Sequence, residues 1–214
     1  MDGQKRRSSE MKDIRTEIIE TVQKEYETGL VTMYEGNASA RVGDRVYITP
    51  SHVAKPDLTE DMMIETDLQG NILRKKEGLK ASSELMMHLE VYRLRDDVQA
   101  IVHNHSVFTT AFAIDGMDIQ SDALTEINLT FGKIPCIPYG RPGTPHIYEH
   151  FKDYLKDYPA VLLANHGLLT FGKTLREAYS MAEAAENIAK TLYVAKQLGK
   201  PADLPEDELK QLRK

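Results

Sequence analysis

Residues 98–105 read Val-Gln-Ala-Ile-Val-His-Asn-His, and this stretch indicates both a fold and a site. Residues 98–102 are short and apolar, which predicts a buried strand. His103 and His105 follow at its end. Side chains two positions apart in an extended chain point to the same face, so one cation could contact both imidazoles. Two partly exposed polar residues at a strand end would give the same spacing, so the pair predicts a metal site only together with further ligands.

A second apolar strand, residues 160–163, leads into Asn165-His166-Gly167. His166 therefore stands at a comparable strand end and is predicted to be the third ligand. Three histidines with one open position are typical of catalytic rather than structural zinc sites. Zinc is the expected ion because neutral imidazole suits it best among the abundant divalent metals, although cobalt, iron or manganese could substitute.

Glu84 follows Ser82-Ser83 at the predicted start of a helix that runs to about residue 95. Free amides, two hydroxyls and the helix dipole at such a start make an anion site. Glu84 is therefore the carboxylate that we expect to act as acid/base. The alternative is an ordinary helix start, which favours the same residues. His88 shares the helix face of Glu84 and is expected to pack there.

Two further segments offer donors at strand ends, and each is a weak signal alone. Gly36-Asn37 precedes a predicted hairpin of residues 38–41 and 45–49, and Ser51 follows it. His146 and His150 are also spaced as a metal pair on a predicted helix over 145–155, but their charged neighbours indicate an exposed face.

The remaining pattern predicts a three-layer α/β/α domain with a central, mainly antiparallel or mixed sheet. A helix is predicted from Ser9 to Gly29, a second hairpin around Gly70-Asn71, and a long helix that starts with the capping box of Thr174 and Glu177. Neither glycine-rich phosphate loop is present, which argues against a nucleotide-binding fold. We expect a flexible segment 1–9, a catalytic domain 10–199 and a charged tail 200–214.

Composition limits the class of protein. The chain has 214 residues, 41% of them hydrophobic, and a formal net charge of −6. It shows no apolar run of membrane length and no secretory signal, and its charge disfavours nucleic acid as the main partner. One cysteine, Cys136, cannot form an intramolecular disulfide. A soluble cytoplasmic protein with no membrane or nucleic-acid partner is expected.

These motifs, in this order and spacing, resemble the class II aldolase/adducin family over residues 11–199. The motifs are Gly36-Asn37-Ala38-Ser39, Ile48-Thr49-Pro50-Ser51, Ser82-Ser83-Glu84, His103-Asn104-His105, Ile134-Pro135-Cys136 and Asn165-His166-Gly167-Leu168. The likeness is greatest to the members that act on L-fuculose 1-phosphate.

The resemblance implies a role for each motif. It implies one Zn²⁺ per subunit held by His103, His105 and His166, with Glu84 as a ligand that moves off to act as acid/base. Phosphate contacts are implied for Gly36, Asn37, Ser51, Ser82 and Ser83. The family's usual assembly is a homotetramer with active sites at subunit interfaces.

The implied reaction is reversible cleavage of a ketose 1-phosphate, with L-fuculose 1-phosphate as first candidate. The products would be dihydroxyacetone phosphate and a small aldehyde such as L-lactaldehyde, by way of a zinc-stabilised enediolate. Two positions depart from the fuculose phosphate pattern. His52 stands in place of glycine, and Leu124 stands in place of an interface tyrosine, which leaves the aldehyde undetermined.

Other members of the family suggest alternatives. A pentulose 5-phosphate 4-epimerase would typically have aspartate at Glu84 and a histidine near the C-terminus, and no histidine follows His166. Methylthioribulose 1-phosphate dehydratases and 3-oxo-tetronate 4-phosphate decarboxylases retain a similar metal site. Adducin-like interaction modules lose the metal set, whereas all three histidines and Glu84 are present here. The sequence therefore favours an enzyme.

Overall fold

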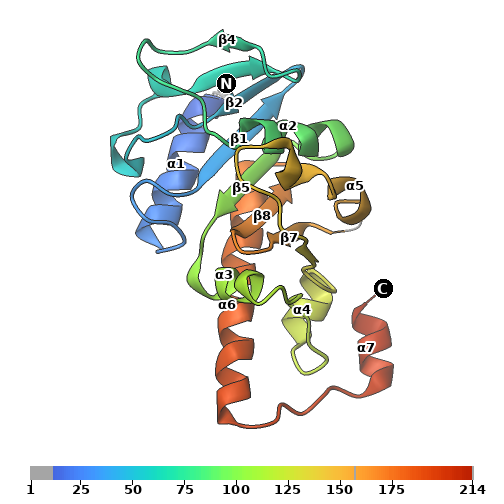
Figure 1. Cartoon of the computed structure of the whole chain (residues 1–214). Coiled ribbons are helices and arrows are strands. Elements are labelled where there is room, and N and C mark those ends of the chain that lie inside the picture. The colour runs from blue at the N-terminus through green and yellow to red at the C-terminus, as the bar shows by residue number, and fades with distance from the viewer. Residues whose placement is uncertain (1–11, 157, 214) are drawn as a thin grey trace, which may run out of the picture.

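A mixed sheet of eight strands forms the centre of the structure, a computed structural model that describes residues 12–156 and 158–213 (Figure 1). The strand order is β4-β3-β2-β1-β5-β8-β7-β6, and all neighbours are antiparallel except β6 and β7. The strands are β1 (Asn37–Val42), β2 (Arg45–Ile48), β3 (Ile64–Asp67), β4 (Ile72–Arg74), β5 (Ala100–Asn104), β6 (Cys136–Ile137), β7 (Ala160–Leu163) and β8 (Gly167–Gly172).

Helices cover both faces of this sheet. The α-helices are α1 (Ile14–Glu27), α2 (Leu85–Leu94), α3 (Val107–Ile114), α4 (Thr125–Thr130), α5 (Phe151–Tyr154), α6 (Leu175–Leu198) and α7 (Glu206–Leu212). The described residues also form the 3₁₀ turns η1 (Lys55–Asp57), η2 (Glu60–Met62) and η3 (Pro145–Tyr148). The predicted segment 1–9 lies outside the described residues.

Side chains of the central strands alternate between two apolar cores. Ala100 and Val102 of β5 belong to the core formed with α1, α3 and α6, whereas Ile101 belongs to the core formed with α2 and α5. This alternation follows from the two-residue period of a strand. A sheet buried on both faces confirms the predicted three-layer α/β arrangement with a mainly antiparallel sheet.

Local capping chemistry fixes the start of α6. The Thr174 hydroxyl accepts a hydrogen bond from the Glu177 amide at 3.1 Å, and the Glu177 carboxylate accepts one from the Lys173 amide at 2.8 Å. Such caps are worth about 1 kcal/mol each. The helix predicted after Thr174 is therefore present, and Gly199 follows its last residue.

Several predicted boundaries are wrong. The helix expected over 145–155 is divided into η3 and α5, and the strand expected over 98–102 is β5, two residues later. Ser82 and Ser83 do not cap α2: its N-cap residue is Glu84, whose amide donates to the Ser82 hydroxyl at 3.3 Å. The charged tail contains α7, in which Leu209 is buried.

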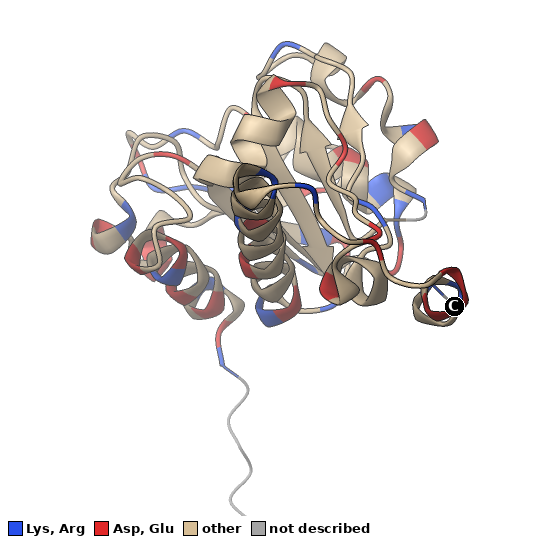
Figure 2. Cartoon of the chain, turned by 90° about the horizontal axis from the view of Figure 1, so that it is seen from below, with Lys and Arg blue, Asp and Glu red and all other residues tan. Residues whose placement is uncertain are grey.

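Charged residues of both signs are interspersed along the helices and the connecting loops (Figure 2). The sheet between them is formed mainly by apolar and neutral residues. Among the described helices, none combines the length and the apolar character needed to cross a membrane.

Candidate metal centre and active site

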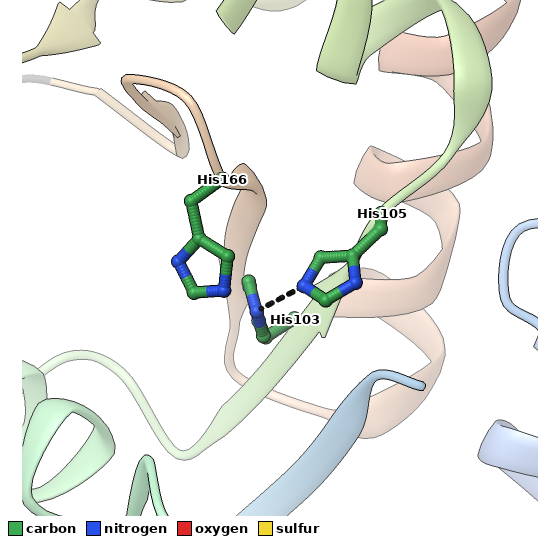
Figure 3. A group of neighbouring side chains, drawn as sticks. All are labelled: His103, His105 and His166. Atoms are coloured by element: carbon green, nitrogen blue, oxygen red, sulfur yellow. Dashed lines mark hydrogen bonds between the residues drawn. The ribbon is translucent and has the colours of Figure 1, made fainter. Parts of the chain in front are cut away.

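Two strand ends bring the three histidines together. His103 lies in β5, His105 directly follows β5, and His166 lies in the turn between β7 and β8. Because β5 pairs with β8 in antiparallel register, with His103 opposite Leu169, that turn sits beside the end of β5. One ring nitrogen of each histidine lies within 4.8 Å of the others, and the rings converge (Figure 3).

Hydrogen bonding orients the His103 ring. Its Nδ1 lies 2.8 Å from the carbonyl oxygen of Leu168, which can only accept, so Nδ1 carries the proton and Nε2 faces the cluster. There it lies 3.1 Å from Nε2 of His105. Two nitrogens on one tetrahedral zinc ion, at Zn–N distances of ~2.0–2.1 Å, would be about 3.3 Å apart. The spacing therefore suits a shared metal ion.

Glu84 completes the cluster from the start of α2. Its carboxylate is 3.0 Å from Nε2 of His103 through one oxygen and 3.3 Å from Nε2 of His166 through the other. The first oxygen also accepts from the side-chain amide of Asn37 at 3.1 Å, while the second is buried without a hydrogen bond. A buried, unsatisfied carboxylate oxygen among imidazole nitrogens fits the ligand set of a divalent cation.

Burial and mutual charge set the protonation of the cluster. Burial disfavours the ionised form of Glu84, but His103 and His166 outweigh it and hold the pKa of this carboxylate well below its usual range. Burial and the neighbouring His103 lower the pKa of His105 to about 4 and that of His166 to about 3. Both imidazoles are therefore neutral near pH 7, with a lone pair free for a metal.

The residues predicted to hold phosphate meet at one cavity beside this cluster. It has a volume of about 230 Å³, and its lining includes Glu84, His105 and His166. All five predicted phosphate contacts also line it: Gly36, Asn37, Ser51, Ser82 and Ser83. The Ser51 amide donates to the Lys80 carbonyl at 2.9 Å, which holds the two serine segments side by side. A larger cavity, bounded by α4, α6 and α7, lies apart from these residues.

Two residues beside the cluster and its cavity have a backbone conformation that is unusual for non-glycine residues. In the part of the chain that the structure describes, His52 and Asn165 are the two non-glycine residues with positive φ, at 58° and 57°. A side chain on Gly167 would lie 2.4 Å from the Asn104 carbonyl and 2.7 Å from the His105 ring. The turn that carries His166 is therefore packed against the H-N-H segment, and only glycine fits after His166.

Comparison with known proteins identifies the family. The sequence profile of the class II aldolase and adducin N-terminal domain matches residues 16–193. The chain belongs to the class II aldolase and adducin family. The L-fuculose phosphate aldolase of Methanococcus maripaludis is 34% identical over 184 residues, which cover 86% of this chain and 98% of that protein.

Other class II aldolase relatives carry different names. The 3-oxo-tetronate 4-phosphate decarboxylase of Haemophilus influenzae is 35% identical over 193 residues, which cover 87% of this chain and 90% of that protein. A solved structure of an L-fuculose 1-phosphate aldolase superposes with a TM-score of 0.87 at 29% identity, covering 95% of this chain and 96% of that one. The family and its fold are thus shown, while the relatives differ in the reaction that they are named for.

The sequence pattern did not indicate some residues of the site. Tyr34, Glu35 and Pro142 also line the cavity, and nothing in the local sequence pattern marks them. Glu25 of α1 lies beneath the site, fully buried, and accepts from the side-chain amide of Asn104 at 3.0 Å. Glu25 is seven residues after Ile18 and so lies on the same, buried face of the helix. This spacing could have predicted its burial from the sequence.

Three other histidines, His88, His146 and His150, do not line the cavity. His88 is buried, with Nδ1 2.7 Å from the Ser39 hydroxyl, which also bonds the Tyr92 hydroxyl at 2.8 Å. Burial lowers the pKa of His88 to about 3, so it packs as a neutral ring. His146 and His150 are exposed around Glu149. Leu124 precedes α4 and packs against the core, outside the cavity lining.

Proposed function

We propose that this chain is a zinc-dependent aldolase that reversibly cleaves a ketose 1-phosphate, with L-fuculose 1-phosphate as first candidate. The products are dihydroxyacetone phosphate and a small aldehyde such as L-lactaldehyde. One observation carries the proposal: a buried carboxylate, Glu84, contacts two of three convergent imidazoles at the edge of a cavity lined with hydroxyl and amide donors.

The protein's own groups divide the work. His103, His105 and His166 hold the ion, with Glu84 as a further ligand in the resting state. When bound, zinc supplies Lewis-acid stabilisation of the negative charge that develops on the substrate carbonyl oxygen. The hydroxyls of Ser51, Ser82 and Ser83, the amide of Asn37 and the backbone at Gly36 bind the phosphate and fix the position of the carbon chain.

Glu84 is the group that moves the proton at C3 of dihydroxyacetone phosphate. Its second oxygen makes no hydrogen bond, so it can accept a proton once Glu84 has moved off the metal. Asn37 holds the other oxygen and fixes the direction of the carboxylate. Positioned acid/base groups of this kind contribute typically ~10²–10⁴-fold to rate. Loss of the carboxylate should reduce turnover by that amount.

The direct test is to incubate the purified, zinc-loaded protein with L-fuculose 1-phosphate and to measure dihydroxyacetone phosphate with a coupled dehydrogenase. Glu84→Gln should retain the three imidazoles and lose at least a hundredfold in kcat, while His103→Ala should lose zinc. His146→Ala, at an exposed histidine, is the matched control. No product from wild-type protein would exclude this substrate.

Decarboxylation of a 3-oxo-tetronate 4-phosphate is the second candidate, because a relative of that name matches at 35% identity. Both reactions break a carbon–carbon bond next to a carbonyl, so the same residues serve either one. Carbon dioxide release distinguishes them. A panel of ketose 1- and 5-phosphates, assayed also for epimers and for water loss, tests the epimerase and dehydratase alternatives.

The expected setting is a homotetramer in the cytoplasm. The single cysteine, Cys136, is half-buried, and burial raises the pKa of its thiol to about 11, which suits an unreactive residue in a reducing compartment. The tetramer is an expectation from the family. Light scattering after size-exclusion chromatography measures the assembly, and a monomer with full activity would contradict it.

A further inference from the structure

His52 holds a backbone conformation that this chain otherwise gives mostly to glycine. Nine glycines of the described residues have positive φ, whereas His52 and Asn165 are the non-glycine residues that do. A left-handed conformation costs a non-glycine residue of the order of 1 kcal/mol or more. Backbone strain of this kind is found at functional sites, where the strained residue takes part in binding or catalysis.

The turn that carries His52 belongs to the predicted phosphate end of the cavity. Pro50 forms a bridge with Ala81, and the Ser51 amide donates to the Lys80 carbonyl at 2.9 Å, so the turn lies against Ser82-Ser83. His52 lines the cavity with Ser51, Ser82 and Ser83. Its own side chain is exposed and makes no hydrogen bond or ion pair with any residue that the structure describes.

The cavity lacks positive charge where an anion would enter. None of the described residues that line it is a lysine or an arginine, and two of them, Glu35 and Glu84, are carboxylates. Of its three lining histidines, His105 and His166 converge on the metal cluster. His52 is therefore the one lining imidazole outside that cluster, and its ring N–H is a hydrogen-bond donor that no described residue uses.

We propose that the His52 side chain is a phosphate-binding contact, which donates a charge-assisted hydrogen bond to a phosphate oxygen. This inference rests on the proposed function, which supplies a phosphate ester as the ligand. It adds a binding residue at a position where the fuculose phosphate members of the family have glycine. It accounts for the strained backbone and the unpartnered imidazole together. Hydrogen bonds of this kind are roughly twice as strong as neutral ones.

Calorimetric titration of the zinc-loaded protein with inorganic phosphate tests the proposal without turnover. His52→Gly removes the imidazole and relieves the strain, and His52→Asn keeps a neutral donor on a residue that tolerates positive φ. We expect both variants to bind phosphate about tenfold more weakly, with unchanged zinc content and a melting temperature at or above that of the wild type. His146→Asn, at an exposed histidine of η3, should bind phosphate normally.

The possible results separate this inference from the proposed reaction. Phosphate affinity within twofold of wild type in both His52 variants overturns the inference, as does a wild type that binds no phosphate or a loss of zinc in His52→Gly. If the variants bind phosphate more weakly but the wild type cleaves no ketose phosphate, the His52 contact is supported and the proposed aldolase activity is excluded. If His52→Gly cleaves the ketose phosphate with an unchanged KM, the aldolase activity is supported and the His52–phosphate contact is excluded.

Discussion

Replacing Glu25 with glutamine should make the stability of the protein less sensitive to alkaline pH. Glu25 is fully buried beneath the candidate metal centre, where one oxygen accepts from Asn104 and the other has no hydrogen-bond partner. Burial raises its pKa from 4.5 to about 8, against the opposing effects of the Asn104 hydrogen bond and the charges of His103 and Lys55. Glutamine keeps the acceptor and the shape but cannot ionise.

The sign and size follow from proton linkage. The folded carboxyl keeps its proton to a higher pH than the unfolded one, so its contribution to stability is fully present below about pH 4.5 and is lost as the pH rises through about 8. At about 1.4 kcal/mol per pH unit, close to 2 kcal/mol is lost between pH 6 and pH 8. In a chain of this length, that equals about 4–8 °C in melting temperature.

Thermal melts of metal-free protein at pH 6 and pH 8 measure this effect. The metal-free form is appropriate because a divalent ion at the histidines would itself lower the pKa of Glu25. The difference between Glu25→Gln and wild type should grow by about 2 kcal/mol over this interval. Glu27→Gln, at an exposed position of the same helix, should follow wild type. Parallel pH profiles for Glu25→Gln and wild type would refute the reasoning.

Three further substitutions test the fold and the site. Gly36→Ala would place a methyl group 2.9 Å from the His103 carbonyl at a φ of 72°, so both zinc content and unfolding free energy should fall; unchanged metal analysis would contradict this. Thr174→Ala removes the α6 cap and should cost about 1 kcal/mol by urea denaturation, with zinc unaffected. In Ser39→Ala, the buried rings of His88 and Tyr92 lose the hydroxyl that both contact, so we expect the free energy of unfolding to fall by about 2 kcal/mol or more. An unchanged free energy of unfolding would show that the two rings hydrogen-bond to each other instead.

Elements with local chemical signals could be predicted from the sequence. The hairpin predicted over residues 38–41 and 45–49 is formed by β1 and β2, and α6 begins after Thr174. The predicted end of β5 was wrong because His103 and Asn104 are polar. Both are in fact buried with partners, the Leu168 carbonyl and Glu25, which come from distant segments. A polar residue can continue a buried strand when tertiary contacts satisfy it.

Where contacts between distant segments determine the local structure, the sequence pattern did not predict it. The helix expected over 145–155 is divided into η3 and α5, and the backbone of His146 packs directly on Gly140, where a side chain would meet its carbonyl oxygen at 2.1 Å. This contact comes from outside the segment whose pattern predicted the helix. For the site, the histidines and Glu84 could be named because strand and helix ends mark them. Pro142 and Tyr34 reach the cavity from loops whose path the sequence does not indicate.

The pairing of β5 with β8 has a consequence for the order in which the site is assembled. His103 and His105 leave the ribosome as a pair about sixty residues before His166, and the third imidazole reaches them only when Leu168 and Leu169 have paired with β5. A nascent chain therefore offers a metal ion only two neighbouring imidazoles. Full affinity would arise when β8 joins the sheet, so that capture of the ion marks the completion of the sheet centre.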